Sequence, residues 1–314
     1  MLRSMYAGIS GMRGFQTKLD TVSNNIANVN TFGFKKGRVT FQDQLSQTVQ
    51  GAQAPQRDEA GNAMLGGRNA KQIGLGTTLG SVDTIHTEGS RQTTNRSLDL
   101  ALGGNGMFVV GEKTTTPAEE DVMSLDEDAI NFTRAGNFYL DEEGYVVTSD
   151  GKYLLGRSNL DDNNQIQPGD TLNDLDEEVT RLRIPVDAQG FSISPDGTVN
   201  MVDSNGQSKI AGQVMLATFS NAEGLEKAGS NLYRLTNNSG VFTDDDGDFN
   251  GFGDLVYPGR NGSASIYAGA LEMSNVDLAE EFTEMITSQR GFQANTRTIT
   301  TSDEILQELV NLKR

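Results

Sequence analysis

Residues 276–314 hold the longest strongly periodic pattern in this chain, and they predict one long amphipathic helix. Apolar side chains recur at gaps of three, four and seven residues, which places them on one face of a helix. They are Leu278, Phe282, Met285, Phe292, Ile299, Leu306 and Val310. Ser274 or Asn275 is predicted to be the N-cap.

A second stripe of the same kind lies near the N-terminus. Its apolar residues are Leu2, Met5, Ile9, Met12, Leu19, Val22 and Ile26. Gly8, Gly11 and Gly14 weaken this helix by roughly 1 kcal/mol each relative to Ala, and they allow a neighbouring helix to approach closely. If the two ends pair, the middle of the chain projects from a helical stalk. Two helices that cap a single-domain core fit the periodicity equally well.

Between the ends the apolar period changes to two, which is typical of strands. The clearest examples are residues 97–110, 132–153 and 191–202. Asp150-Gly151, Asp196-Gly197 and Asn205-Gly206 separate strand-like runs and predict hairpins. The fold class is therefore α+β, with terminal helices and a β-rich middle of one or two domains. We predict a terminal helical domain (1–30 with 275–314), a connecting segment (31–70) and a β-rich outer region (71–274), with a small inserted subdomain near 141–205.

Charge and residue usage exclude several classes of protein. The chain has 25 basic and 43 acidic residues, a net charge of −18, which repels nucleic acids and anionic membrane surfaces. It has no Cys, so disulfides and thiolate chemistry are excluded. No apolar run approaches the roughly 18 residues needed to span a bilayer, so we expect no membrane insertion. The N-terminus lacks a signal-peptide pattern, which predicts a cytosolic protein or export without a cleaved signal.

No enzyme signature is present, and we expect no catalytic residue and no bound cofactor. His86, the single histidine, lies in a polar stretch without a nucleophile elbow nearby. The glycine-rich segments 74–80 and 103–106 lack the lysine of a P-loop and are predicted to be turns.

One acidic segment resembles the first half of a calcium-binding loop. Its candidate ligands are Asp246, Asp248, Asn250 and Asp254, at loop positions 1, 3, 5 and 9. Position 12, where a bidentate Glu belongs, is Tyr257. The pattern favours an acidic surface turn, with a weak Ca²⁺ site as the alternative.

The motif SNNIANVNTFGFKK, at 23–36, strongly resembles the N-terminal signature of the flagellar rod, hook and hook-associated family of axial proteins. Residues 271–314 look like the matching C-terminal signature, and three internal segments agree in the same order: LDLALGGNGMFVV, FTRAGNFYLDEEGYVVTSDG and GSNLYRLTNNSG. The motif positions are Asn24, Asn25, Ala27, Asn28, Thr31, Gly33 and Phe34. Gly33 is predicted to form a turn that Phe32, Phe34 and Phe41 anchor by burial.

The resemblance implies a structural subunit rather than an enzyme. In this family the paired terminal helices form the inner wall of a tube as a coiled coil, and the β-rich domains lie outside. It implies a helical homopolymer outside the cell, exported through the flagellar type III apparatus, with rod, hook-cap and hook–filament junction proteins as partners. The two ends look most like the hook members of Gram-positive bacteria, with the distal rod members as the alternative. A secreted, calcium-binding adhesin is the rival from another class.

Overall fold

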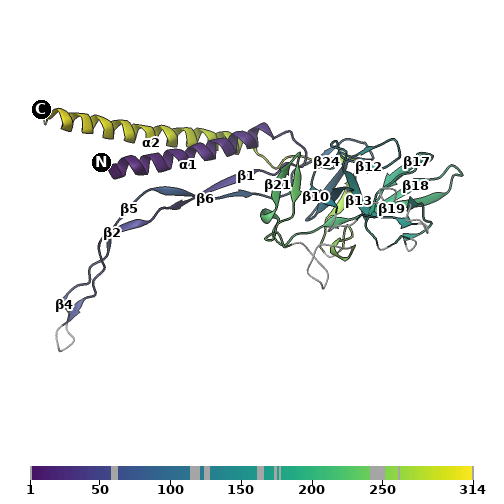
Figure 1. Cartoon of the computed structure of the whole chain (residues 1–314), viewed down its shortest axis with the longest axis horizontal. Coiled ribbons are helices and arrows are strands. Elements are labelled where there is room, and N and C mark those ends of the chain that lie inside the picture. The colour runs from purple at the N-terminus through teal and green to yellow at the C-terminus, as the bar shows by residue number, and fades with distance from the viewer. Residues whose placement is uncertain are drawn as a thin grey trace. The chain divides into compact units, whose positions relative to one another are not determined.

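The computed structural model describes residues 2–57, 63–113, 121–123, 128–160, 166–172, 175–176, 178–240, 252–260 and 262–312 (Figure 1). The chain forms two compact units. The first, which we call the helical unit, comprises Met1–Ala27, Gly37–Thr84 and Asp277–Arg314. The second, the sheet unit, comprises Asn28–Lys36 and Ile85–Val276.

The helical unit contains two long helices, α1 (Leu2–Ala27) and α2 (Leu278–Leu312). The hydroxyls of Ser4 and Ser302 are 3.5 Å apart, and Lys18 forms an ion pair with Glu284 at 3.2 Å. Residue numbers rise along α1 as they fall along α2, so the helices pack antiparallel. Neither helix, over its described residues, is long and apolar enough to cross a membrane.

Residues 37–84 form a long two-stranded ribbon in the helical unit, which we call the hairpin (Figure 1). Three antiparallel pairs follow one another along it: β1 (Gly37–Asp43) with β6 (Thr77–Thr84), β2 (Ser46–Gln50) with β5 (Lys71–Gly74), and β3 (Gln56–Arg57) with β4 (Ala63–Leu65). The ring of Phe41 lies 5.9 Å from that of Phe15 on α1. Phe41 is nevertheless 40% exposed, so the prediction that it is anchored by burial is wrong.

The sheet unit is built on one twelve-stranded antiparallel sheet. Its main path runs β17 (Gly190–Ile193), β18 (Thr198–Val202), β19 (Ser208–Val214), β13 (Tyr153–Arg157), β9 (Met107–Glu112), β10 (Ala129–Thr133), β22 (Leu232–Arg234) and β21 (Glu226–Gly229). Beside it pair β11 (Tyr139–Leu140), β12 (Val146–Val147), β16 (Thr180–Arg181) and β20 (Leu216–Ala217).

Smaller elements complete the sheet unit. β7 (Arg91–Thr93) pairs with β24 (Ala270–Glu272), β8 (Leu100–Gly103) with β23 (Ser265–Ala268), and β14 (Asn159–Leu160) with β15 (Ile166–Gln167). Two short 3₁₀ helices, η2 (Ala222–Gly224) and η3 (Phe252–Asp254), also belong to the sheet unit.

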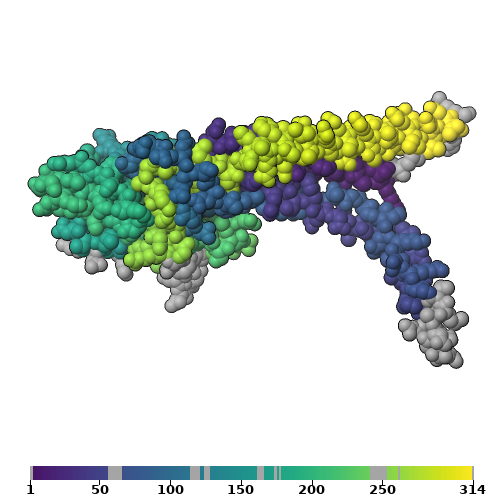
Figure 2. Space-filling model, turned by 180° about the vertical axis from the view of Figure 1, so that it is seen from behind, coloured from purple at the N-terminus to yellow at the C-terminus, as the bar shows by residue number. Residues whose placement is uncertain are grey.

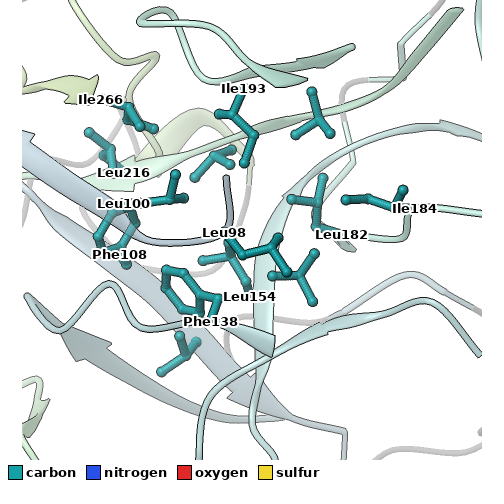
Figure 3. Packing of buried hydrophobic residues seen from close by; sticks show 14 of the residues in the cluster. Leu98, Leu100, Phe108, Phe138, Leu154, Leu182, Ile184, Ile193, Leu216 and Ile266 are labelled. Atoms are coloured by element: carbon teal, nitrogen blue, oxygen red, sulfur yellow. The ribbon is translucent and has the colours of Figure 1, made fainter. Parts of the chain in front are cut away.

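The core of the sheet unit is divided into two clusters by the alternation of strand side chains. On β9, Phe108 and Val110 belong to one cluster, whereas Met107 and Val109 belong to the other. Figure 3 shows part of the first cluster, in which Phe108 of β9, Leu154 of β13 and Ile193 of β17 are among the packed side chains. Burial on both faces explains why 107–110 is a continuous apolar run rather than an alternating one.

The coarse fold prediction is confirmed: a helix at each end and a β-rich middle. The three predicted hairpin turns are also confirmed, since Gly151, Gly197 and Gly206 have φ near +80° between paired strands. The predicted N-cap of α2 is wrong. Asp277, one residue before the helix, accepts a hydrogen bond from the N–H of Ala279 at 2.8 Å and caps it instead. The predicted domain boundaries stay predictions.

Candidate assembly surface

The side of α2 that faces α1 follows a regular spacing. Eight of its less exposed positions alternate gaps of four and three residues: Glu281, Met285, Ser288, Phe292, Asn295, Ile299, Ser302 and Leu306. Four of these, Met285, Phe292, Ile299 and Leu306, belong to the predicted stripe. A gap pattern of this kind keeps one seam of the helix against its neighbour over many turns.

Glycines let the two helices approach closely. A Cβ atom on Gly291 would lie 2.6 Å from Cζ of Phe15, and one on Gly11 would lie 2.9 Å from Nδ2 of Asn295. Both distances are too short for a side chain without movement of a neighbour. The predicted role of the α1 glycines in close helix approach is therefore confirmed at Gly11.

The remaining predicted interface residues have different exposures. On α2, Leu278, Phe282 and Val310 are exposed by 39%, 49% and 65%. On α1, Val22 is buried. The partly buried residues of the predicted α1 stripe are Met5, Ile9, Met12, Leu19 and Ile26. The side chain of Leu2 lies outside the described residues. The α2 stripe therefore divides into a part that packs inside the helical unit and a part that faces solvent.

The hairpin adds exposed apolar side chains that the sequence did not predict. Leu45 is 83% exposed, Val49 62% and Ile73 49%. An isolated two-stranded hairpin is marginally stable in water. Leu45 and Val49 are four residues apart with only polar residues between them, which is a weak signal for a strand, and short runs rich in Gln, Thr and Gly are also typical of loops.

Exposed large apolar residues concentrate on the helical unit. Within the described residues they include Tyr6, Leu45, Val49, Ile73, Val82, Phe282, Ile286, Ile305, Leu309, Val310 and Leu312 there, against Tyr139, Leu140, Leu172, Val186, Val202 and Tyr267 on the sheet unit. Exposed apolar side chains gathered on one part of a protein favour its interaction with other molecules. The helical unit is therefore the candidate assembly surface.

Asn25 of the family motif fixes the start of the hairpin to the helices. Its side chain is buried and exchanges two hydrogen bonds of 2.9 Å with the backbone of Gly37, one as donor and one as acceptor. The same amide donates to Oε2 of Glu281 on α2 at 3.1 Å. Asn25 thus acts as a backbone mimic that joins three segments of the helical unit.

Asn275 has a similar role in the sheet unit. Its Oδ1 accepts from the N–H of Lys36 at 2.8 Å, and its Nδ2 donates to the carbonyl of Ile85 at 2.8 Å.

Gly33 has φ +68°, and its N–H donates to the carbonyl of Glu272 at 2.8 Å, which confirms the predicted turn. Phe34 is buried as predicted.

Other motif positions are less enclosed. Asn24 and Ala27 are exposed, whereas Asn28 and Thr31 are partly buried. The hydroxyl of Thr31 donates to Oδ1 of Asn28 at 3.1 Å. The motif therefore contributes local turn contacts in addition to the links made by Asn25.

A buried ionic network in the sheet unit was missed by the sequence prediction. Glu272 accepts from Nζ of Lys35 through Oε1 and from Nε of Arg134 through Oε2, and all three side chains are buried. The N–H of Gly89 also donates to Glu272, at 3.0 Å. Burial lowers the pKa of Lys35. The three residues lie far apart in the sequence, so no local pattern indicates that they meet.

The candidate chemical sites stay without support. The environment of His86 lowers its pKa to about 4: burial is the main cause, and Lys35, Lys227 and Arg134 add to it. Asp246, Asp248 and Asn250 lie outside the described residues, whereas Asp254 is buried in η3. Among the described residues, no group of three or more His, Asp or Glu side chains is placed to hold a metal ion.

Comparisons with known proteins place the chain in one class, the structural proteins of the flagellar rod and hook. Three family profiles match, "Flagella basal body rod protein" over 5–35, "Flagellar hook protein FlgE/F/G D1 domain" over 101–201 and "Flagellar basal body rod FlgEFG protein C-terminal" over 267–312. The chain is 48% identical to the flagellar basal-body rod protein FlgG of Bacillus subtilis over 314 residues, the whole of both chains. It belongs to the flagellar rod and hook family of structural proteins.

Both subtypes occur among the relatives. The rod protein FlgG of Caulobacter vibrioides is 34% identical over 313 residues, 99% of this chain and 100% of that one. The hook protein FlgE of Borreliella burgdorferi is 30% identical and also covered in full, but over an alignment of 459 residues. A solved Helicobacter pylori hook protein, FlgE2, covers 66% of this chain and 47% of that one at 12% identity, with a TM-score of 0.20, too low to carry an argument.

Proposed function

We propose that this chain is the subunit of a straight, tubular distal rod, in which copies assemble through the helical unit. The concentration of exposed apolar side chains on that unit is the observation that carries the proposal. Such surface is costly in water and is removed from it when copies pack together. Contacts between unlike surfaces that do not close on themselves produce a helical polymer.

The length of the chain favours the rod over the hook, which the sequence alone had placed first. The alignment with the Bacillus subtilis rod protein needs no insertion, since it spans 314 residues and covers both chains in full. The alignment with the Borreliella burgdorferi hook protein is far longer than this chain. The hook remains the second candidate because that relative matches the chain along its whole length.

In the proposed polymer, α1 and α2 form a coiled-coil stalk that lines the tube. The alternating spacing from Glu281 to Leu306 supports this role. Many subunits would then order helices that are weak in isolation. We propose as partners the neighbouring rod and hook proteins and the flagellar export apparatus, with an extracellular location in the basal body. A weak calcium site at 246–254 stays a separate proposal.

Electron microscopy of the purified full-length chain after assembly tests this function. Straight tubes of uniform diameter are the expected result. Curved tubes would indicate a hook subunit, the second candidate, in place of a distal rod subunit. A chain that stays monomeric at every concentration and ionic strength would contradict the structural-polymer proposal itself.

A further inference from the structure

A groove of about 560 Å³ lies between α1 and the hairpin, within the helical unit. Tyr6 and Ile9 line it from α1, and Leu75 and Leu79 line it from the hairpin. Tyr6 is 70% exposed and Leu79 is 40% exposed, so the groove presents apolar surface to water.

Two arginines give the groove a positive charge. Arg3 and Arg13 both line it, and neither forms an ion pair within the described part of the chain. No acidic side chain is among the lining residues. A basic groove is unusual on a chain whose net charge is −18, so its preferred occupant is acidic.

The groove lies on the side of α1 that is turned away from α2. The α1 residues along it include Arg3, Tyr6, Ser10, Arg13 and Thr17. The α1 residues that meet α2 include Ser4, Gly8, Gly11 and Phe15. At 100° per residue the two sets are roughly 150° apart around the helix. The α2 helix of the same chain therefore cannot occupy the groove.

The C-terminal end of α2 has the complementary surface. Ser4 meets Ser302, so the residues after Leu306 extend past the N-terminal end of α1 (Figure 2). Ile305, Leu309 and Leu312 are 48%, 49% and 83% exposed and share one face, at gaps of four and three. Glu304 and Glu308 flank this stripe.

We propose that the groove receives residues 303–312 of α2 from a second copy of this chain. Anchors at i, i+4 and i+7 are how an amphipathic helix binds an apolar groove, and the glutamates would face Arg3 and Arg13. The donating and receiving surfaces differ, so the contact continues from copy to copy instead of closing a dimer. The inference rests on the proposed polymer and names one of its contacts.

Cysteine cross-linking tests the contact directly, since the natural chain has no Cys. Ser10→Cys, at the middle of the groove, and Leu309→Cys, at the middle of the stripe, are introduced into separate full-length chains that are mixed, assembled and oxidised. We expect a cross-linked dimer from the mixture and a ladder of multimers from the double variant. Arg234→Cys, at an exposed arginine of the sheet unit, replaces Ser10→Cys in the control and should give no dimer with Leu309→Cys.

Charge reversal tests the ionic part of the contact. Arg3→Glu with Arg13→Glu should raise the concentration needed for assembly about tenfold, and adding Glu304→Arg with Glu308→Arg should restore it to within about threefold. Arg234→Glu with Arg260→Glu, on exposed positions of the sheet unit, makes the same change in net charge and is the matched control. It should leave the assembly concentration within about threefold of the natural value.

Each outcome separates the contact from the polymer. Tubes that form without the Ser10–Leu309 cross-link, or groove variants that assemble like the control, would overturn the contact and leave the proposed function standing. A dimer of Ser10→Cys with itself would mean that grooves face each other, which also overturns it. Chains that stay monomeric throughout would contradict both the contact and the polymer.

Discussion

At the scale of single residues, the sheet unit depends on one buried carboxylate. Glu272 supplies the single negative charge that pairs with both Lys35 and Arg134. Removing one partner of a buried ion pair leaves an uncompensated charge, which is far more costly than losing an exposed pair.

Glu272→Gln is therefore expected to lower the free energy of unfolding by about 3–5 kcal/mol in urea denaturation. Glu88→Gln is the matched control in the same unit, because Glu88 pairs with Arg91 at 3.8 Å and both side chains are about 40% exposed. Its loss should stay below about 1 kcal/mol. Equal losses from the two variants would show that the buried network contributes no more than a surface pair.

The lowered pKa of His86 predicts that the folded chain loses stability on acidification. Its pKa is about 4 in the folded chain, against an ordinary value of 6.5, so between these values the unfolded chain binds more protons. Stability is therefore present above pH 6.5 and is lost as pH falls toward 4. At pH 5 the free energy of unfolding should be about 2 kcal/mol lower than at pH 7. His86→Phe should remove most of this difference, and an unchanged pH profile in that variant would refute the assignment.

Residue-scale prediction from the sequence succeeded where the signal was local. The turn at Gly33 and the burial of Phe34 could be read from the motif itself. The roles of Lys35, Arg134 and Glu272 could not, because a long-range ionic contact leaves no pattern in the segments that it joins. Asn25 could be predicted to bond to backbone, but not to the particular backbone of Gly37.

At the scale of elements, the packing of α1 against α2 depends on the glycines that let the two helices approach closely, Gly11 and Gly291. Gly291→Ala raises helix propensity by roughly 1 kcal/mol, yet the added Cβ meets the ring of Phe15. We expect a net loss of about 1–3 kcal/mol in the stability of the helical unit, measured by thermal denaturation with circular dichroism.

Two further variants separate crowding from propensity. Gln289→Ala, at an exposed position of the same helix, should be neutral or slightly stabilising, because Ala is the better helix former. Phe15→Leu combined with Gly291→Ala should recover part of the loss, because the smaller side chain makes room. If Gly291→Ala alone were as stable as Gln289→Ala, the two helices would not be closely packed at Gly291.

Both helices were predictable because their apolar periodicity extends over many turns. The division of the α2 stripe into an inner and an exposed part was not, because Phe282 and Met285 are equally apolar and only the position of α1 distinguishes them. The hairpin was missed for a different reason. Strands β2 and β5 are stabilised by backbone pairing, whereas their side chains are mostly polar and exposed, so no apolar alternation marks them in the sequence.

At the scale of the whole molecule, net charge should control assembly. Copies that each carry −18 repel one another over a Debye length, and salt screens that repulsion. The sedimented fraction should therefore rise between about 0.01 M and about 1 M ionic strength. A fraction that falls with salt would mean that attractive ion pairs between copies outweigh their mutual repulsion.

The central claim, that copies assemble through the helical unit, is tested most directly by electron microscopy of two paired variants. Phe282→Ser with Ile286→Ser removes exposed apolar surface from α2, and Tyr139→Ser with Leu140→Ser removes it from the sheet unit. Circular dichroism should show both variants to be folded. We predict that only the second still forms tubes. Tubes from the α2 variant as abundant as those of the natural chain would contradict the claim.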